Sequence, residues 1–351
     1  MKKVLLIGLV LMLALGANAS TSADNASAAG DYQLVWNMDF TGASLNSDAF
    51  NIEVNGDGGG NNELQYYCEK GVSLGVEPTT GKHCLILTAT KENYLGKTCT
   101  SGRVNTLGKV FFTYGKVEAR IRFPQTANGL WPAFWMMGNN YSEVGWPRCG
   151  ELDIIELGHQ DGIKAGTQDR YFNGAMHVGS RWDAVWSDAK SVTYDYSVED
   201  GFHTVSCEWT PTSVEMFVDK DIYPDAKPYF SAKLEPDEND DYNRQLIWSR
   251  PNFIIFNLAI GGNFPGIWDI NGITALAGGP RKMYVDYLRI YQRGDVGETF
   301  QSKVASEPIE DATGIQNPSV KDPARKVLRN GEIHIFYNGS EYNLLGEKIN
   351  E

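Results

Sequence analysis

Apolar and polar residues alternate in short segments along most of the chain, a pattern typical of β-strands. Residues 34–40 show it clearly, because Leu, Trp, Met and Phe alternate there with Val, Asn and Asp. Further β-rich segments are residues 85–90, 115–123, 172–178, 202–209, 214–219, 253–260 and 283–291. Gly, Pro, Asn and Asp separate these segments, and no stretch keeps a helical period over ten positions. The pattern predicts an all-β fold, either an antiparallel sandwich or a barrel.

One apolar segment, residues 150–157 with the sequence GELDIIEL, carries three carboxylates. In a strand, side chains alternate between faces, so Glu151 and Asp153 share one face and Glu156 falls on the other. One extra residue in the strand, a β-bulge at Ile154 and Ile155, would return Glu156 to the face of the other two acids. Because bulges are over-represented beside active sites, the E-x-D-x-x-E spacing predicts a bulged catalytic strand.

Three carboxylates on one face repel one another, which raises the pKa of one of them until it holds a proton. A retaining glycosidase needs this combination. One ionised carboxylate attacks the anomeric carbon, and a protonated carboxyl about 5 to 5.5 Å away protonates the leaving oxygen. We therefore expect Glu151 to be the nucleophile and Glu156 the acid/base, with Asp153 assisting through a hydrogen bond to the nucleophile.

Two other interpretations of these acids are a solvated strand face and a calcium site. The apolar neighbours of the acids, together with the upstream Trp146, favour an aromatic-walled site over a solvated face. The segment also lacks the Gly and Asn/Asp pattern of a calcium-binding loop. Both interpretations are therefore less favoured than the catalytic one.

The N-terminus has the three parts of a secretory signal peptide. Lysines at positions 2 and 3 precede an apolar run at residues 4–15, and an A-x-A cleavage site ends at Ala19. We expect a signal peptide at residues 1–19, a linker at 20–30 and an exported protein that is periplasmic, cell-surface or secreted. The apolar run is shorter than the about 20 residues that span a bilayer, and no later stretch reaches that length.

Composition narrows the range of partners. The formal charge of −13 and the pI near 4.9 disfavour nucleic acid and anionic membranes, whereas a neutral polysaccharide is indifferent to this charge. Aromatic residues make up 12% of the chain, with nine Trp and seventeen Tyr. Because aromatic rings stack on the apolar faces of sugars, this content favours carbohydrate binding.

The five cysteines, Cys68, Cys84, Cys99, Cys149 and Cys207, lack the C-x-x-C spacing of metal sites. Export permits disulfides, and the odd number leaves at least one thiol free. We interpret Cys149, which lies close to Glu151, as a small buried thiol and not as a redox group.

The end of the chain differs from the rest. Residues 31–293 are predicted to form the catalytic domain, and residues 294–325, which are polar and poor in aromatic residues, a linker. Within residues 326–351, two strand-like segments flank Asn338-Gly339, a dipeptide preferred in tight hairpins. Since a lone hairpin is marginally stable in water, we interpret this segment as an address or sorting tail.

Several motifs follow one another along residues 32–292. They are GNNELQYY at 60–67, SGR at 101–103, YGKVEAR at 114–120, GLWPAFWM at 129–136, GELDIIE at 150–156, NLAIGGN at 257–263 and MYVDY at 283–287. In this order they resemble glycoside hydrolase family 16, and within it the laminarinase-like endo-β-1,3(4)-glucanases. The resemblance implies a concanavalin A-like β-jelly-roll sandwich of two antiparallel sheets with a concave substrate cleft. It also implies retaining hydrolysis by the bulged acid strand.

By the same resemblance, Trp131, Trp135 and Trp146 are expected to line the glycone side of the cleft as stacking platforms. Trp135 could equally belong to the sandwich core. Trp146 is a poorer core residue because it lies in a Gly-Trp-Pro turn beside the acids.

The resemblance also assigns polar contacts. Asn61, Glu63 and Arg103 resemble residues that bind sugar hydroxyls, and His177 resembles a histidine near the acid/base. Glu63 has an alternative role in stabilising its own loop. Asp286 matches a side chain that contributes to a structural calcium site in many members, although it could equally be an outward-facing strand residue. No cofactor is expected for catalysis.

The residues after His177 depart from laminarinase-like members, which more often have a Trp directly after this histidine. Here residues 178–183 read VGSRWD, and this loop is expected to line the leaving-group side. Linkage preference therefore stays open between β-1,3-glucan and mixed-linkage β-1,3/1,4-glucan, cut internally by a monomeric enzyme. The alternatives are a galactan hydrolase of the agarase or carrageenase type and a non-catalytic glucan-binding module. The binding module is disfavoured because binding needs no cluster of three mutually repelling acids.

Overall fold

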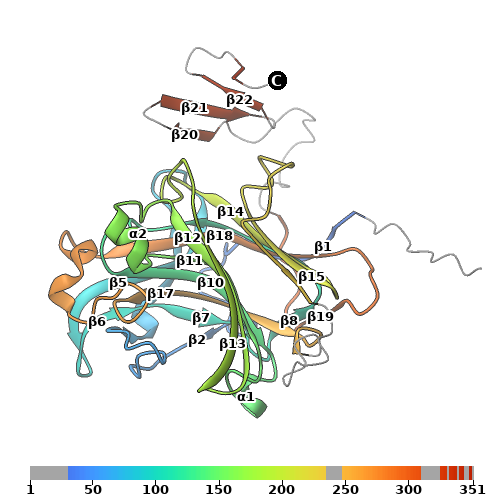
Figure 1. The fold of residues 1–351 in the computed structure, drawn as a ribbon, viewed down its shortest axis with the longest axis horizontal. Helices are drawn as coiled ribbons and strands as arrows, with labels where there is room; N and C mark the ends of the chain where they lie inside the picture. The colour runs from blue at the N-terminus through green and yellow to red at the C-terminus, as the bar shows by residue number, and fades with distance from the viewer. Residues whose placement is uncertain are drawn as a thin grey trace, which may run out of the picture.

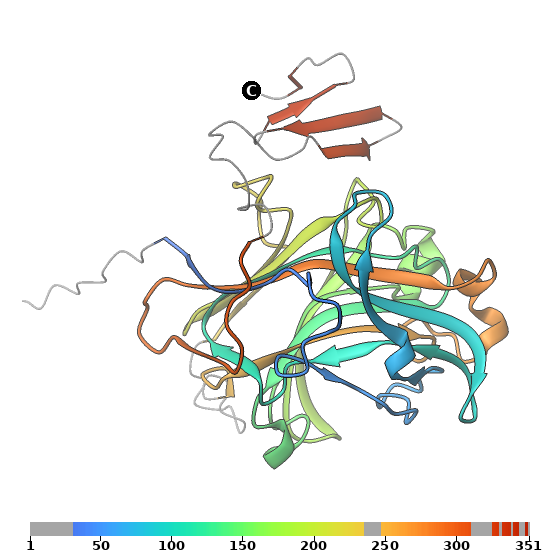
Figure 2. The ribbon, with the colours of Figure 1, turned by 180° about the vertical axis from the view of Figure 1, so that it is seen from behind.

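The computed structural model describes residues 31–234 and 247–309, and then 325–329, 332–337, 340–343 and 348–349. In this part of the chain two large sheets pack face to face, as Figures 1 and 2 show from opposite sides. All strand pairs of these sheets are antiparallel except one short pair, β3 with β6. The predicted sandwich of two antiparallel sheets is confirmed.

The first sheet has ten strands among the described residues. In spatial order they are β16 (Phe230–Lys233), β15 (Ser213–Val218), β14 (His203–Trp209), β9 (Gly115–Arg122), β18 (Arg281–Gln292), β5 (His83–Tyr94), β6 (Lys97–Ser101) and β3 (Tyr66–Tyr67), with β1 (Gln33–Met38) beside β18 and β4 (Val72–Val76) beside β5.

The second sheet has nine strands in the same described ranges. In spatial order they are β13 (Ala184–Thr193), β12 (Tyr171–Arg181), β11 (Glu151–Leu157), β10 (Leu130–Gly138), β17 (Asn252–Ile260), β7 (Arg103–Asn105) and β2 (Asn51–Ile52), with β8 (Val110–Thr113) beside β17 and β19 (Thr299–Ser302) beside β8.

Helices are short. They are α1 (Tyr141–Val144), α2 (Gln160–Ala165) and the 3-10 turns η1 (Glu69–Gly71), η2 (Ile270–Gly272) and η3 (Thr274–Leu276). Among the described residues, none of them has the length and apolar composition needed to cross a membrane.

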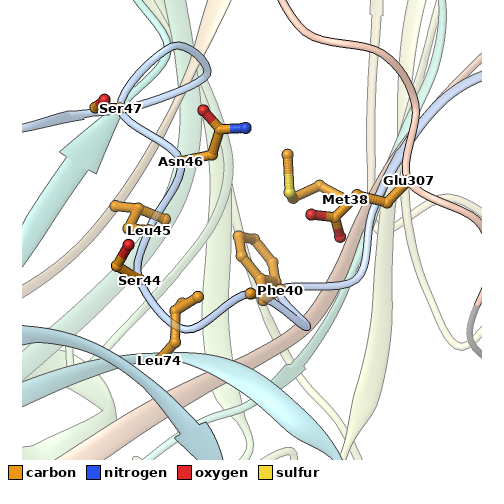
Figure 3. Close-up of a pocket in the computed structure, with 9 residues that line it drawn as sticks. Met38, Phe40, Ser44, Leu45, Asn46, Ser47, Leu74 and Glu307 are labelled. Atoms are coloured by element: carbon orange, nitrogen blue, oxygen red, sulfur yellow. The ribbon is translucent and has the colours of Figure 1, made fainter.

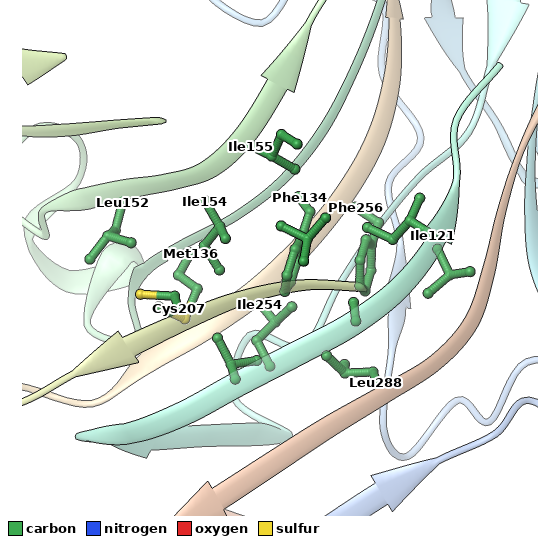
Figure 4. Packing of buried hydrophobic residues seen from close by; sticks show 14 of the residues in the cluster. Ile121, Phe134, Met136, Leu152, Ile154, Ile155, Cys207, Ile254, Phe256 and Leu288 are labelled. Atoms are coloured by element: carbon green, nitrogen blue, oxygen red, sulfur yellow. The ribbon is translucent and has the colours of Figure 1, made fainter. Parts of the chain in front are cut away.

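The core lies between the two sheets, and Figure 4 shows its centre. Phe134 of β10 and Phe256 of β17 stack there with ring centroids 4.8 Å apart. Leu152 of β11 faces the same interior, as do Ile121 of β9 and Leu288 of β18. These side chains are fully buried because each strand directs every second residue inward. The opposite face of the nine-stranded sheet is thereby free to carry polar groups.

All five cysteines lie in the described ranges, and all are buried free thiols. Cys149 belongs to a small buried cluster with Met137, Phe253 and Ile255. Burial raises the pKa of its thiol to about 12, so it stays protonated near neutral pH, as expected for a packing residue.

The sandwich extends beyond the boundary that the sequence predicted at residue 293. Strand β19 pairs with β8, and Glu307 Oε2 accepts a hydrogen bond from the Asp39 amide at 2.8 Å. The start of residues 294–325 is therefore part of the domain and not a linker. Glu307 also lines a surface pocket of about 350 Å³ with Met38 and Phe40 (Figure 3), and none of the candidate site residues lines it.

The predicted C-terminal hairpin has an additional strand. Strands β21 (Glu332–Tyr337) and β22 (Ser340–Tyr342) pair as predicted, and β20 (Arg325–Arg329) pairs with the other side of β21. The predicted signal peptide and the linker at residues 20–30 lie outside the described residues and stay predictions.

Candidate active site

The site is organised by the bulge in β11. Against β10, Phe134 pairs with Ile155 and Trp135 with Asp153, which leaves Ile154 without a partner in the register. Ile154 and Ile155 are both fully buried in the core. Because two consecutive side chains point inward, Glu156 returns to the outer face of the sheet with Asp153. The predicted bulge is confirmed at the predicted residues.

Glu156 is held from the two strands beside it. Trp131 Nε1 of β10 donates to Glu156 Oε1 at 2.9 Å, and Asn173 Nδ2 of β12 donates to Glu156 Oε2 at 2.8 Å. The glutamate is 9% exposed. Each carboxylate oxygen thus has one N–H donor, which fixes the plane of the group.

Asp153 links the other two polar groups of the site. It hydrogen-bonds to Glu151, and its Oδ2 lies 3.2 Å from His177 Nε2. His177 Nδ1 in turn lies 2.6 Å from Ser187 Oγ. His177 therefore contacts the assisting aspartate, whereas the sequence placed it near the acid/base.

Glu151, Asp153 and His177 offer ligand atoms that lie within 4.8 Å of one another, so their spacing alone would also suit a metal ion. The contacts do not favour that interpretation. Asp153 is engaged by both Glu151 and His177, and the imidazole is held by Ser187 on its other side. We interpret the group as a hydrogen-bonded chain that orients Glu151.

Burial raises the pKa of all three carboxyl groups. Repulsion adds to this effect, because Asp153 acts on Glu151 and Glu156 acts on Asp153. On Glu156, the hydrogen bonds from Asn173 and Trp131 lower the pKa and partly offset burial. The pKa of Glu156 is therefore raised less than the pKa values of Glu151 and Asp153.

Trp131 does not have the exposed position of a stacking platform. It is 9% exposed, and Phe264 covers one face of its ring at a centroid distance of 4.5 Å and an angle of 8°. His159 packs edge-on against Phe264 and stacks on Tyr171. The sequence assignment of Trp131 is corrected here, since its contacts make it a residue that positions Glu156.

Trp135 lies on the outer face of the sheet and not in the core between the sheets. Its Nε1 donates to Asn257 Oδ1 at 2.6 Å, and the Arg103 guanidinium lies 4.8 Å from its ring. Arg103 is held in turn by Glu53 at 2.9 Å. These contacts place a cation and an aromatic ring beside Asp153, the register partner of Trp135.

Glu63 turns into the protein and not toward the open face. It is 5% exposed and accepts hydrogen bonds from Gln65 Nε2 at 2.5 Å and from the Tyr67 hydroxyl at 3.1 Å. The alternative role, stabilising its own loop, therefore describes Glu63 better than a sugar contact does. Asn61 stays half-buried on that loop, where its carbonyl accepts from the Asn263 amide at 2.8 Å.

Two exposed tryptophans lie on the loops before β11 and after β12. Trp146 is 41% exposed, and Trp182, at the turn between β12 and β13, is 79% exposed. The Gly179 amide donates to the Pro147 carbonyl at 3.2 Å, so the loop of Trp146 and the end of β12 contact each other. The stacking role of Trp146 stays a prediction, and Trp182 is a second exposed ring at this end of the strands.

With this geometry, the comparisons with known proteins can be interpreted. Residues 62–238 match the model of glycosyl hydrolases family 16. The chain belongs to this family. The glucan endo-1,3-beta-glucosidase of Cryptopygus antarcticus is 34% identical over 68% of this chain and 83% of its own length. The solved structure of a Bacteroides ovatus mixed linkage glucan GH16, in complex with a G4G4G3G product, is 35% identical. It covers 73% of this chain and 100% of that chain, with a TM-score of 0.64.

Another relative is longer than this family 16 chain. The clotting factor G alpha subunit of Tachypleus tridentatus is 33% identical over 74% of this chain, which spans only 34% of that protein.

The family resemblance also pointed to a structural calcium at Asp286. In the structure, the Asp286 carboxylate forms an ion pair with Arg120 of β9. Ca²⁺ takes six to eight oxygen ligands, and among the described residues no cluster of three acidic or metal-ligating side chains includes Asp286. These side chains do not fit the ion, because a guanidinium already neutralises the carboxylate. Calcium at this position stays a prediction.

Sequence reasoning missed four residues of this family 16 site, namely Asn173, Asn257, Phe264 and Glu53. Each touches a residue that the sequence did single out. Asn257 begins the motif NLAIGGN, but the sequence gave it no role in the site. Asn173 carried a weak signal, as an amide in an otherwise apolar strand segment. Its position opposite Glu156 depends on the register that follows the bulge.

Proposed function

We propose that this chain is an endo-acting β-glucanase that hydrolyses internal bonds of β-1,3-glucan or mixed-linkage β-1,3/1,4-glucan with retention of configuration. The observation that carries the proposal is the bulge of β11, which places Glu156 on the face of Glu151 and Asp153. Family membership supports it, as do the glucan-active relatives. The signal-peptide pattern of the sequence supports export.

In the first step, the Glu151 carboxylate attacks the anomeric carbon while Glu156 transfers a proton to the leaving oxygen. Glu151 must be ionised for this attack, although burial and Asp153 raise its pKa. Because Asp153 hydrogen-bonds to Glu151, it can take the proton of Glu151 and leave the charge on the nucleophile. His177 holds the other side of Asp153 and so fixes the direction of that bond.

In the second step, Glu156 acts as a base that takes a proton from the incoming water. The two N–H donors on its oxygens stabilise the ionised form that this step requires. Before the first step Glu156 must acquire a proton, and burial favours the protonated form. These two effects oppose each other, and burial is the larger, so the pKa of Glu156 is raised.

Release of reducing sugar from a panel of polysaccharides tests the proposal. Laminarin and barley β-glucan are expected to be cut into oligosaccharides, with a rapid fall in viscosity that indicates internal cleavage. Agarose and κ-carrageenan are expected to give no product. Release from a galactan alone would assign the chain to that substrate class, and no release from any polymer would favour a binding module.

Two substitutions test the roles of the glutamates. Glu151→Gln is expected to abolish turnover of both glucans, and retention of most wild-type activity would contradict the nucleophile assignment. Glu156→Gln is expected to remove the alkaline limb of the pH–rate profile on activated aryl glycosides, which need no acid. An unchanged profile would contradict the acid/base assignment.

A further inference from the structure

Asn173 lies next to the acid/base Glu156, and its side-chain oxygen, Oδ1, has no hydrogen-bond partner among the described residues. It sits on β12 opposite Glu156 in the register, is 7% exposed, and donates from Nδ2 to Glu156 Oε2 at 2.8 Å. Its Oδ1 is buried. Buried polar atoms are usually hydrogen-bonded, so an acceptor left open beside a catalytic group points to a ligand.

The orientation of this amide follows from its neighbour. A rotated amide would direct Oδ1 at Glu156 Oε2, which would bring two acceptors together whenever the carboxylate is ionised. Trp131 Nε1 already occupies the other oxygen of Glu156. The amide nitrogen therefore faces the carboxylate, and the carbonyl oxygen is the atom left for another donor.

The donor is identified by what must lie beside Glu156 during the reaction. A general acid reaches the leaving oxygen within hydrogen-bond distance, so the amide bound to that acid lies near the sugar that carries this oxygen. The leaving glucose carries a hydroxyl group on at least one carbon next to the carbon that bears the glycosidic oxygen. We propose that Asn173 Oδ1 accepts a hydrogen bond from a hydroxyl of the leaving-group glucose, while Asn173 Nδ2 positions Glu156.

This proposal rests on the proposed function and adds a specificity-determining residue to it. Asn173 ties the orientation of the acid to the presence of a sugar on the leaving-group side. An aryl leaving group has no hydroxyl for Oδ1, so it cannot make this contact. The charged groups that interact with Glu156 besides the two donors are Glu151, Asp153, Glu63 and His177, and they are the same for both kinds of substrate.

The test compares kcat/KM for barley β-glucan or laminarin with kcat/KM for a phenyl glycoside of a matching gluco-oligosaccharide, whose leaving group needs the acid but carries no sugar hydroxyl. Asn173→Ala is expected to lose about tenfold more on the polysaccharide than on the aryl glycoside, because one hydrogen bond to the sugar is lost. Loss of the N–H donor is also expected to move the alkaline limb on the polysaccharide upward by about one pH unit. Ser191→Ala is the matched control, since Ser191 is the exposed register partner of Asn173 on β13.

Asn173→Asp separates the two roles. It keeps the acceptor oxygen but removes the N–H and adds a like charge, so the alkaline limb should move further than in Asn173→Ala. The polysaccharide-to-aryl ratio should stay closer to that of the wild type. Equal losses on both substrates for Asn173→Ala, or an unmoved alkaline limb in both variants, would overturn the proposal.

The wild-type panel decides the proposed function separately. A wild-type protein that cuts glucan, combined with equal losses in Asn173→Ala, rejects the role of Asn173 alone. A wild-type protein inactive on every glucan rejects both.

Discussion

Trp131 connects the acid/base to an aromatic stack, and one substitution can separate its two contacts. Trp131→Phe removes the Nε1–H that donates to Glu156 Oε1 at 2.9 Å. It keeps an aromatic ring to stack on Phe264, which lies 4.5 Å from the indole. Glu156 Oε2 retains its bond from Asn173. The variant therefore changes the electrostatics of the carboxylate more than the shape of the site.

The size of the effect follows from the lost bond. A hydrogen bond to a charged group contributes about 1.5–3 kcal/mol, and one pKa unit corresponds to about 1.4 kcal/mol. Because this bond stabilises the ionised carboxylate, its loss should raise the pKa of Glu156 by about 1 to 2 units. Glu156 must be protonated in the first step, so the alkaline limb of kcat/KM should move to higher pH by the same amount.

The assay is the pH dependence of kcat/KM on a soluble β-glucan, with thermal unfolding as the check on folding. Phe264→Leu is the matched control, because it weakens the stack but leaves the indole N–H in place. Its alkaline limb should move less than half as far as that of Trp131→Phe. If Trp131→Phe keeps the wild-type limb while its overall rate falls, the indole does not tune Glu156 and the reasoning is refuted.

Three further substitutions give independent predictions. Trp182→Ala should raise KM for glucan about twofold to tenfold through the loss of one stacking contact, with kcat little changed; an unchanged KM in initial-rate measurements would argue against a sugar at this ring. Asp153→Asn should lower kcat at least about hundredfold. Burial raises the pKa of Asp153, so the stability of the wild type falls as pH rises through that pKa. The variant should therefore raise Tm at pH 7 but not at pH 4, and equal Tm differences at both pH values would contradict this. Burial raises the pKa of Glu199 to about 7, so the folded state loses stability as pH rises from about 4.5 to 7. Glu199→Gln should therefore have a Tm a few degrees above that of the wild type at pH 8, a smaller gain at pH 5, and unchanged activity.

The bulge was predictable from the sequence because only one local solution satisfies its pattern. With a period of two, the spacing of the acids puts Glu156 on the wrong face of a regular strand. Burying an unpaired carboxylate in an apolar core is costly, whereas burying a second isoleucine is favourable. The sequence offered Ile154 and Ile155 at the one place where an extra inward residue restores the acid to the outer face, and both are fully buried.

The surroundings of the acids were less predictable, because they depend on pairing between distant segments. The sequence placed Trp131 near the site but could not show that Phe264, from a loop far along the chain, covers its ring. It could not assign Asn173 either. The bulge shifts the register between β11 and β12, so the partner of Glu156 follows from the three-dimensional pairing and not from counting residues.

The domain boundary was missed for a different reason. Strand β19 is polar, with the sequence TFQS, and its burial alternates only between exposed and half-buried residues. This edge strand pairs with β8 and packs a single aromatic side chain, Phe300, against the core, which is too little apolar pattern to predict a strand. Polar composition therefore indicated a linker where the structure continues the sheet.

Core packing and catalysis depend on the same residues in this fold. Glu156 is on the outer face only because Ile154 and Ile155 together fill space between the sheets. Removing one of these residues would restore the regular alternation and turn the carboxylate inward, where neither Trp131 nor Asn173 could reach it. Shortening either side chain would instead leave a cavity directly behind the catalytic strand. The alignment of the acid/base is thus set by the apolar interior as much as by its two hydrogen-bond donors, and substitutions behind the site should change the pH–rate profile as well as stability.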